Sequence, residues 1–360
     1  MLRPRWNIAQ LPAAKHGGIN YPELLKLGIS PAEVLDFSVC TNPCGPPGGL
    51  KEALATTDWE HYPDSESTVL KTRLAEKLDV STTNLIIGSG STELFRLVAT
   101  AYLAPGDAAL VMQPTYGEYE LASQTAGAQI IKLASREEDN FWIDPVEIIK
   151  MTRRHQPKCV FLCNPNNPTG QYLARRDIEQ ILEAAQDTLL ILDEAYLAFT
   201  DNAWSAVDLV DKVNLLLVRS MTKDYALAGL RLGYGIAGEE IISILNKVKP
   251  PWNVNSYAQK AGIYVLDDEQ YLERNRREIA RAKAFLIESL QRLGLAVLPS
   301  RTNYFLVKVG DATSFRQALL KKGILVRDAT SFGLPEHIRL GVKPKNECRR
   351  LIEAIKEMGG

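Results

Sequence analysis

Residues 213–231 read VNLLLVRSMTKDYALAGLR, in which a strongly apolar run ends in hydroxyl groups and cations. The apolar part, from Val213 to Val218, predicts a buried β-strand. Open α/β sheets bind their ligands at the carboxyl ends of their strands. We therefore expect this strand to deliver Lys223 and its polar neighbours to a ligand.

The residues that follow this strand have the chemistry of an aldehyde and phosphate site. A lysine that is partly desolvated among cations has a lowered pKa and can form a Schiff base with an aldehyde, as Lys223 would. The hydroxyls of Ser220 and Thr222 and the guanidinium of Arg231 suit a phosphate dianion. Aldehyde and phosphate together describe pyridoxal 5'-phosphate. The alternative is a lysine at an ordinary exit from a strand.

Length and composition are those of a globular enzyme with one large and one smaller domain, because 360 residues exceed the size of a single core. A formal net charge of −1 without long charge blocks argues against nucleic acid and anionic membranes as partners. No apolar run approaches the roughly 18 residues of a membrane span, and the N-terminus has no apolar signal core. We expect a cytoplasmic protein.

The five cysteines do not form a recognisable metal motif. Cys159 and Cys163 flank a short apolar run and are better explained as small core residues. Cys40 and Cys44 have the same spacing, but histidines are scarce and no CxxC or HxxxH pair occurs. The sequence therefore predicts no metal site.

Apolar runs alternate with amphipathic helical patterns from residue 85 onward. This order predicts right-handed crossovers and a mainly parallel sheet that is covered on both faces. The predicted strands are residues 85–87, 108–112, 129–133, 159–162, 189–192 and 213–218.

The C-terminal part has a different pattern. After a Pro-rich turn at residues 250–255 we expect one long helical region that is charged from Asp267 to Lys283, followed by an α+β module. The expected strands of the module are residues 295–298, 304–307, 324–327 and 337–340, with helices near 313–321 and 347–358. We expect an N-terminal arm (1–35) that packs with the small domain, a large domain (36–260) and a small C-terminal domain (261–360).

Polar residues at the ends of several predicted strands suit one ligand. The carboxylate of Asp193 could keep a pyridinium nitrogen protonated, which lets the ring act as an electron sink. Asn167 and Tyr196 are placed to hydrogen-bond the phenolic oxygen of the ring, and Tyr116 offers a flat face for stacking.

The turn Gly88-Ser89-Gly90-Ser91-Thr92 leads from a predicted strand into a predicted helix. A Gly/Ser turn at a helix start presents free backbone N–H groups to an anion, so Ser91 and Thr92 would add donors to the phosphate site. The alternative reading of this turn alone is an ordinary helix cap.

With these motifs the sequence resembles the fold-type I pyridoxal-phosphate enzymes, specifically the class I/II aminotransferase family. The resemblance runs from His16 to the last helix and is carried by the segments 164–170, 193–196 and 220–233. It implies an aminotransferase-like large α/β domain with a mainly parallel seven-stranded sheet, a smaller α+β C-terminal domain, and a small amino compound as substrate.

The resemblance also implies roles for individual residues. Lys223 would carry the cofactor, and Asp193 would pair with the ring nitrogen. Tyr62 would reach the phosphate of the neighbouring subunit's cofactor, which implies a homodimer with shared active sites. Arg339 matches the arginine that binds the substrate carboxylate, and Arg327 matches a second anion-binding arginine.

Two subfamilies are similar to this sequence. The arm His16-Gly17-Gly18 and the segments 36–38, 219–223 and 251–255 look most like threonine-phosphate decarboxylase of cobalamin biosynthesis. The same frame, with residues 115–119 and 323–328, is similar to histidinol-phosphate aminotransferase. Cys40 departs from both, because they usually have an asparagine there and a thiol is a weak hydrogen-bonding group.

Decarboxylation of a phosphorylated amino acid is the first hypothesis, and amino transfer from histidinol phosphate or another amino acid is the alternative. The outcome depends on which bond of the α-carbon is perpendicular to the ring, and Arg327 and Arg339 would set that angle. A regulatory pyridoxal-binding domain without catalysis would need a DNA-binding module, for which residues 1–30 are too short.

His16 bears on the choice between the two reactions. If the arm closes over the site, His16 could donate to a substrate phosphate oxygen, and Gly17 would let the main chain approach the ligand closely. The alternative is a flexible Gly-Gly hinge with His16 on the surface.

Overall fold

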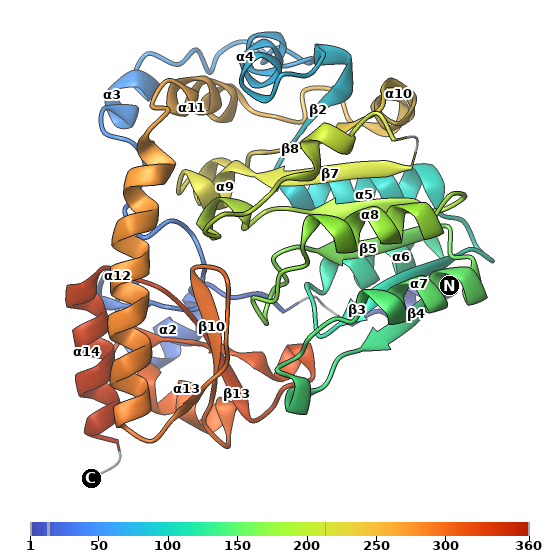
Figure 1. Cartoon of the computed structure of the whole chain (residues 1–360). Coiled ribbons are helices and arrows are strands. Elements are labelled where there is room, and N and C mark those ends of the chain that lie inside the picture. Colours follow the sequence, from blue (N-terminus) through green and yellow to red (C-terminus); the bar gives the residue numbers. More distant parts are fainter. Residues whose placement is uncertain (1, 13–14, 213, 359–360) are drawn as a thin grey trace.

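A seven-stranded sheet forms the centre of the molecule, with strand order β2-β8-β7-β6-β5-β3-β4 (Figure 1). The computed structural model describes residues 2–12, 15–212 and 214–358. Strand β8 pairs antiparallel with both its neighbours, and the pairings from β7 to β4 are parallel. The strands are β2 (Leu85–Gly88), β3 (Ala108–Gln113), β4 (Gln129–Ala134), β5 (Cys159–Cys163), β6 (Leu189–Asp193), β7 (Leu215–Ser220) and β8 (Gly233–Ala237).

The first four residues of β7, Leu215 to Val218, are apolar because both faces of the strand are buried. Leu215 and Leu217 pack in the core on one face of the sheet, while Leu216 and Val218 pack in the core on the other face. Successive side chains of a strand alternate between faces, so a sheet covered on both sides needs apolar residues at every position. Val213, where the predicted strand began, lies outside the described residues.

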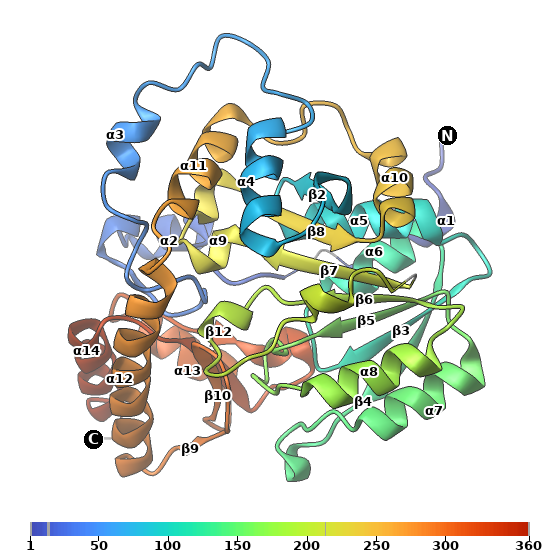
Figure 2. The ribbon, with the colours of Figure 1, turned by 45° about the horizontal axis from the view of Figure 1, so that its top comes forward.

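Helices cover both faces of this sheet. Figure 2 shows α7 and α8 on one side and α5, α6 and α10 on the other. The first side is completed by α4 and α11, whose leucines, alanines and valines share its core. The bounds are α4 (Thr68–Leu78), α5 (Ser91–Tyr102), α6 (Glu118–Ala126), α7 (Pro145–His155), α8 (Arg175–Ala184), α10 (Glu239–Val248) and α11 (Ser256–Leu266).

A second core lies around a four-stranded sheet of order β12-β13-β10-β9. Helices α12 and α14 run alongside each other against it (Figure 1). Its elements are β9 (Ala296–Val297), β10 (Tyr304–Lys308), β12 (Arg327–Asp328), β13 (His337–Gly341), α12 (Tyr271–Arg292), α13 (Ala312–Leu320) and α14 (Lys345–Lys356). The predicted mainly parallel seven-stranded sheet with a smaller α+β part is confirmed.

The N-terminal segment joins this second part. Strand β1 (Leu35–Asp36) pairs parallel with β11 (Ile324–Leu325), and Leu24 of α2 (Tyr21–Leu27) packs against the same region. Phe37 and Cys40 belong to the second core. The domain boundaries at residues 35/36 and 260/261 stay predictions. Three further helices are α1 (Trp6–Ala9), α3 (Leu50–Leu54) and α9 (Met221–Asp224).

Two sequence expectations were wrong. The long helical region after residue 255 is two helices, α11 and α12, separated at residues 267–270. The separating residues are polar and suit helix ends better than a helix interior. The predicted strand at residues 324–327 is divided between β11 and β12, which belong to different sheets.

Strand β8 was not predicted from the sequence, because glycine is uncommon in β-strands. A Cβ at Gly233 would lie 2.7 Å from the backbone nitrogen of Ser91. Glycine is therefore required at Gly233 by the close approach of α5. The prediction that Cys159 and Cys163 are core residues is confirmed, because both are buried.

Candidate active site

The carboxyl ends of three neighbouring strands bring their polar residues together. Cys163, Asp193 and Val218 are register partners on β5, β6 and β7. The segments that follow the three strands therefore begin side by side. They contain Asn167, Tyr196 and Lys223, as expected from parallel strands.

Asp193 is a buried carboxyl held by two donors. The hydroxyl of Tyr119 donates to Oδ2 at 2.5 Å, and the backbone N–H of Ala195 donates to Oδ1 at 2.9 Å. Burial raises the pKa of Asp193 to about 6, and the two hydrogen bonds oppose that rise. An ionised carboxyl that is fixed in a dry site in this way suits a cationic partner.

Lys223 stands in α9, directly after β7, with its backbone fixed from outside the sheet. The backbone N–H of Asn42 donates to the carbonyl oxygen of Lys223 at 2.9 Å, and Nδ2 of Asn42 donates to the carbonyl oxygen of Asp224 at 2.9 Å. Nζ of Lys223 lies 5.9 Å from the centre of the Tyr196 ring. Burial lowers the pKa of Lys223 below that of an ordinary lysine, and the charge of the nearby Arg339 lowers it further.

A cradle of donors lies beside Lys223, where β7 and β8 meet the N-terminus of α5. The hydroxyls of Ser220 and Thr222 are 2.6 Å apart. Gly90 precedes α5 with a φ of +77°, and a Cβ at Gly90 would lie 2.7 Å from Nη2 of Arg231. These hydroxyls, the guanidinium and the free N–H groups of the helix start form an arrangement that suits an anion.

The predicted ring contacts lie around the same space. Oγ1 of Thr92 and the hydroxyl of Tyr116 share a hydrogen bond of 3.1 Å. The Tyr196 ring packs edge-on against Tyr304, with 4.7 Å between centres. Asn167 is buried and accepts a hydrogen bond through Oδ1 from Nη1 of Arg339.

Arg327 and Arg339 are register partners on β12 and β13. Among the described residues, no carboxylate forms an ion pair with either. Nη2 of Arg339 donates to the carbonyl oxygen of Ser38 at 2.8 Å, and Nε of Arg339 is buried without a described acceptor. Burial, and then the charge of Arg339, lowers the pKa of Arg327 to about 10. Two like charges directly opposite each other are unfavourable, so this pair favours an anion.

The N-terminal arm packs on the site, but His16 is engaged by the protein itself. Nε2 of His16 donates to Oε1 of Glu118 at 2.9 Å, and its ring centre lies 5.8 Å from that of Tyr116. Gly17 leaves no room for a side chain, because a Cβ there would lie 2.5 Å from the carbonyl oxygen of Ser38. Close main-chain approach at Gly17 is therefore present, although it is toward Ser38.

Tyr62 is not brought together with the other predicted site residues. Its side chain is 78% exposed and stacks on Trp252, with 4.3 Å between ring centres. Cys40, where the related subfamilies usually have an asparagine, is buried. Burial raises the pKa of Cys40, so the thiol form is favoured.

Three residues of this site were not identified from the sequence. Tyr119 and Glu118 follow the predicted stacking residue Tyr116 within three positions. This closeness in the sequence was the available signal. Asn42 stands in a Pro- and Gly-rich connector whose sequence gives no sign of a contact with the segment after β7. Long-range contacts of this kind depend on how the two cores pack.

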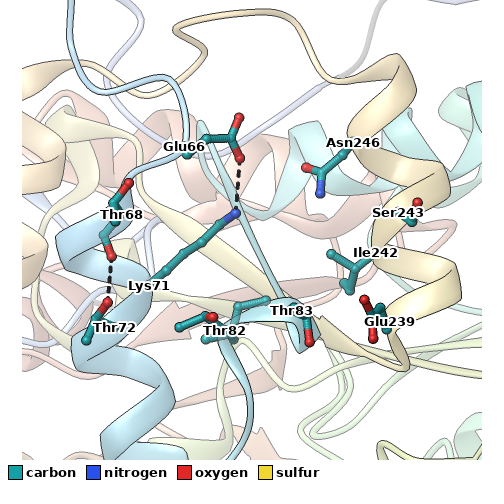
Figure 3. A pocket seen from close by; sticks show the side chains of 11 residues that line it. Glu66, Thr68, Lys71, Thr72, Thr82, Thr83, Glu239, Ile242, Ser243 and Asn246 are labelled. Carbon is teal, nitrogen blue, oxygen red and sulfur yellow. Dashed lines mark hydrogen bonds and ion pairs between the residues drawn. The ribbon is translucent and has the colours of Figure 1, made fainter.

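A cavity of about 430 Å³ lies elsewhere, between α4 and α10 (Figure 3). Its wall carries hydroxyl groups and the ion pair between Lys71 and Glu66, which are 3.3 Å apart. No predicted cofactor residue lines it. The described residues contain no group of three or more histidine, cysteine, aspartate or glutamate side chains that could hold a metal ion. No helix in the described ranges is long and apolar enough to cross a membrane.

Comparisons with known proteins agree on one family. The model of aminotransferase class I and II matches residues 41–355. Histidinol-phosphate aminotransferase 1 of Thiobacillus denitrificans is 37% identical over 339 residues, which are 92% of this chain and 87% of that protein. The structure of histidinol-phosphate aminotransferase from Sinorhizobium meliloti in complex with pyridoxal-5'-phosphate has a TM-score of 0.88 at 24% identity and covers 99% of both chains. L-threonine-O-3-phosphate decarboxylase from Porphyromonas gingivalis has a TM-score of 0.79 at 27% identity, covering 89% of this chain and 98% of that one.

Proposed function

Because the chain belongs to the aminotransferase class I and II family, we propose that it is a histidinol-phosphate aminotransferase. Its cofactor is pyridoxal 5'-phosphate, the cofactor of that family and the one predicted from the sequence around Lys223. The observation that carries the choice of substrate is the 37% identity to a histidinol-phosphate aminotransferase over 92% of the chain. The relatives thus favour the alternative over the decarboxylase that the sequence ranked first.

The donor set described above fits the cofactor. In this proposal Ser91, Ser220, Thr222 and Arg231 hold the phosphate, because hydroxyls, a guanidinium and helix N–H groups meet there. The missing Cβ of Gly90 leaves the space beside Arg231 open. When bound, the cofactor supplies an electron sink for the electrons released at the amine-bearing carbon of the substrate.

The side chains around that space have separate tasks. Asp193 keeps a proton on the ring nitrogen, and Tyr119 holds Asp193 in place. Lys223 would carry the cofactor, and its Nζ as a neutral amine would move the proton of the substrate's amine-bearing carbon. Tyr116 stacks on the ring, while Asn167 and Tyr196 donate to its phenolic oxygen.

The substrate's phosphate is assigned to Arg327 and Arg339. No described carboxylate forms an ion pair with either arginine. Arg327 donates to the carbonyl oxygen of Lys15 in the N-terminal arm, and Arg339 donates to Oδ1 of Asn167. Arginine binds phosphate bidentately, so an anion between the two side chains would remove their repulsion. In this assignment the position of the substrate's phosphate determines which bond of the amine-bearing carbon is perpendicular to the cofactor ring.

Amino transfer is chemically simpler to assign than decarboxylation for this substrate. Histidinol phosphate has an alcohol-derived phosphate ester where an amino acid has its carboxylate, so its amine-bearing carbon has no carbon dioxide to lose. The features that favoured the decarboxylase were the resemblance of the arm His16-Gly17-Gly18 and of the segments 36–38, 219–223 and 251–255, together with the hypothesis that His16 donates to a substrate phosphate. In the structure His16 bonds to Glu118, which weakens the hypothesis about His16.

We also propose a cytoplasmic homodimer in which Tyr62 reaches the partner's cofactor. The supporting observation is that Tyr62 is exposed and held by its stack on Trp252. A partner subunit seated on this region would bury both rings. Tyr62→Phe would then loosen the cofactor in the dimer, measured as a faster loss of cofactor on dialysis.

The experiment that tests the function compares two substrates. Histidinol phosphate with 2-oxoglutarate should yield glutamate, and O-phospho-L-threonine should release no carbon dioxide. The Lys223→Ala protein is the control and should do neither. Carbon dioxide from O-phospho-L-threonine, without glutamate from histidinol phosphate, would return the decarboxylase to first place.

A further inference from the structure

Helix α9 has a second polar space beside it, separate from the cofactor site. Asp224, the residue after Lys223, lines a cavity of about 280 Å³ that Lys223 does not line. The cavity is bounded by α4, by the loop at residues 194–205, by the start of β8 and by α12. In Figure 1, α9 lies at the end of β7, below α11.

Three buried side-chain atoms around this cavity have no hydrogen-bond partner among the residues that the structure describes. They are Oδ1 of Asp224, Oγ1 of Thr200 and Nε of Arg276. Buried polar groups are nearly always satisfied in folded proteins, so three such atoms around one cavity require an explanation. A carboxylate acceptor, a hydroxyl and a guanidinium donor are left for a bound molecule.

Among the described residues, Arg219 is the cation whose charge acts on Asp224, and Arg219 already has other partners. Arg219 forms an ion pair with Glu194 at 2.9 Å and also donates to the hydroxyl of Ser205. Glu194 accepts two further hydrogen bonds, from the hydroxyl of Ser205 and from the backbone N–H of Ala206, each at 2.9 Å. This network is complete within itself, so it leaves Asp224 without a partner in the described chain.

Other lining residues are apolar and include Leu74, Leu266 and Leu272. Two cations also line the cavity. Lys77 is exposed, and Arg276, whose side chain is 33% exposed, pairs with Glu273 at 2.6 Å through Nη2, while its Nε has no partner among the described residues. The lining therefore combines a buried carboxylate, leucines and two cations.

From this arrangement we propose that the cavity is a non-catalytic binding site for a free aliphatic α-amino acid. The ammonium group would meet Asp224 and Thr200, the carboxylate would meet Arg276 and Lys77, and the side chain would lie against the leucines. The cavity is slightly smaller than the usual range for drug-sized ligands, roughly 300–1,000 Å³, which suits a molecule of this size.

Occupancy of this site would be transmitted to Lys223. Asn42 holds the carbonyl oxygens of both Lys223 and Asp224, each at 2.9 Å, so the two residues move together with one connector. The cavity also lies between α4 and the first turns of α12, a helix that begins in the first core and continues into the second. A ligand that bridges these helices would bias the arrangement of the two cores, and the site would act as an effector site.

Binding must be measured where the active site cannot take the amino acid. Borohydride reduction of the cofactor-loaded protein should fix the cofactor to Lys223, and isothermal titration with L-leucine then reports other sites. We expect one saturable site per chain. Isoamylamine, which lacks the carboxylate, and 4-methylpentanoate, which lacks the ammonium group, should each bind at least tenfold more weakly.

Variants of the carboxylate and of one cation that line the cavity test the assignment. Asp224→Asn and Arg276→Gln should each weaken leucine binding at least tenfold. Asp201→Asn, an exposed carboxylate of the same loop that does not line the cavity, should leave it unchanged. Arg276 is partly exposed, so its variant keeps the test available if Asp224→Asn fails to fold.

Absent leucine binding, or equal affinity in the two cavity variants and the parent protein, would overturn the proposal. The failure of the proposed function is visible separately, because it would appear in the glutamate assay with histidinol phosphate. A wrong assignment of Lys223 would appear as cofactor lost from the reduced protein.

Discussion

Asp193, the last residue of β6, and Asp224, the last residue of α9, are two buried carboxyls that differ in what surrounds them. Burial raises the pKa of Asp193 to about 6 and that of Asp224 to about 7. Tyr119 and Ala195 donate to Asp193, whereas no described group donates to Oδ1 of Asp224. Burial alone therefore does not mark a catalytic carboxyl. The donors that hold it ionised and fixed are what prepare it for a cation.

The largest expected effect is that of Asp193→Asn. An amide cannot keep a proton on the ring nitrogen, so kcat should fall by several powers of ten, at about 1.36 kcal/mol for each tenfold. Cofactor binding should persist, because the phosphate cradle is unchanged. Asp224→Asn is the matched comparison and should lose less than tenfold in the same assay. Similar losses in both variants would mean that the difference between the two carboxyls has no catalytic meaning.

Asp224→Asn should instead change stability, and in the stabilising direction. Asp224 binds its proton more tightly when folded, with a pKa of about 7 against the ordinary 3.8. The wild-type protein therefore loses stability as pH rises from about 4 to 7, and it stays lower above pH 7. At pH 8 the variant should be more stable by an amount on the order of 4 kcal/mol at most.

Thermal unfolding of the unliganded protein at pH 8 and at pH 4.5 measures this difference. The increase in Tm should be present at pH 8 and much smaller at pH 4.5, where the carboxyl is protonated in the folded protein and the stability loss that begins near the unfolded pKa of 3.8 is still small. A lower Tm of the variant at pH 8 would show that Asp224 has a partner that the arrangement described here does not include.

Much of the fold was predictable because each buried strand carries its own signal. The apolar run before Lys223 and the polar residues after it gave both the strand and the site edge, since strand direction fixes where the side chains emerge. Arg327 and Arg339 were found only through resemblance to the family. Their alignment on neighbouring strands is a property of the second sheet.

The parts that could not be predicted depend on contacts between distant segments. Strand β8 begins with Gly233, which the approach of Ser91 requires, and nothing in the sequence around Gly233 indicates that contact. The hydrogen bond from Tyr119 to Asp193 joins residues 74 positions apart. The three unpartnered atoms of the second cavity come from separate elements, so no sequence motif describes them.

Tyr119→Phe tests the donor that distinguishes Asp193 from Asp224. The change removes one hydrogen bond to a charged group, worth roughly 1.5–3 kcal/mol, so kcat should fall about ten- to a hundredfold. The hydrogen bond lowers the pKa of Asp193, so its loss should move the acid limb of the pH–rate profile to higher pH. A fall in kcat without that movement would indicate only disturbed packing.

The smallest effect is expected at His16, which bonds to a third buried carboxyl. The side chain of Glu118 is 3% exposed, and its pKa is lowered by the hydrogen bond from His16 and by that from Arg96. Glu118 therefore still has Arg96 as a cationic partner when His16 is removed. Because the His16 side chain is 47% exposed, the pair should be worth about 1 kcal/mol or less.

His16→Ala should consequently raise KM by no more than about fivefold, equally for histidinol phosphate and for histidinol. The equality is the informative part, because an arm that only packs on the site affects every substrate alike. Glu118→Gln should have the larger effect, since it leaves both His16 and Arg96 without their carboxylate. A rise in KM confined to the phosphorylated substrate would mean that His16 leaves Glu118 when substrate binds and donates to the phosphate.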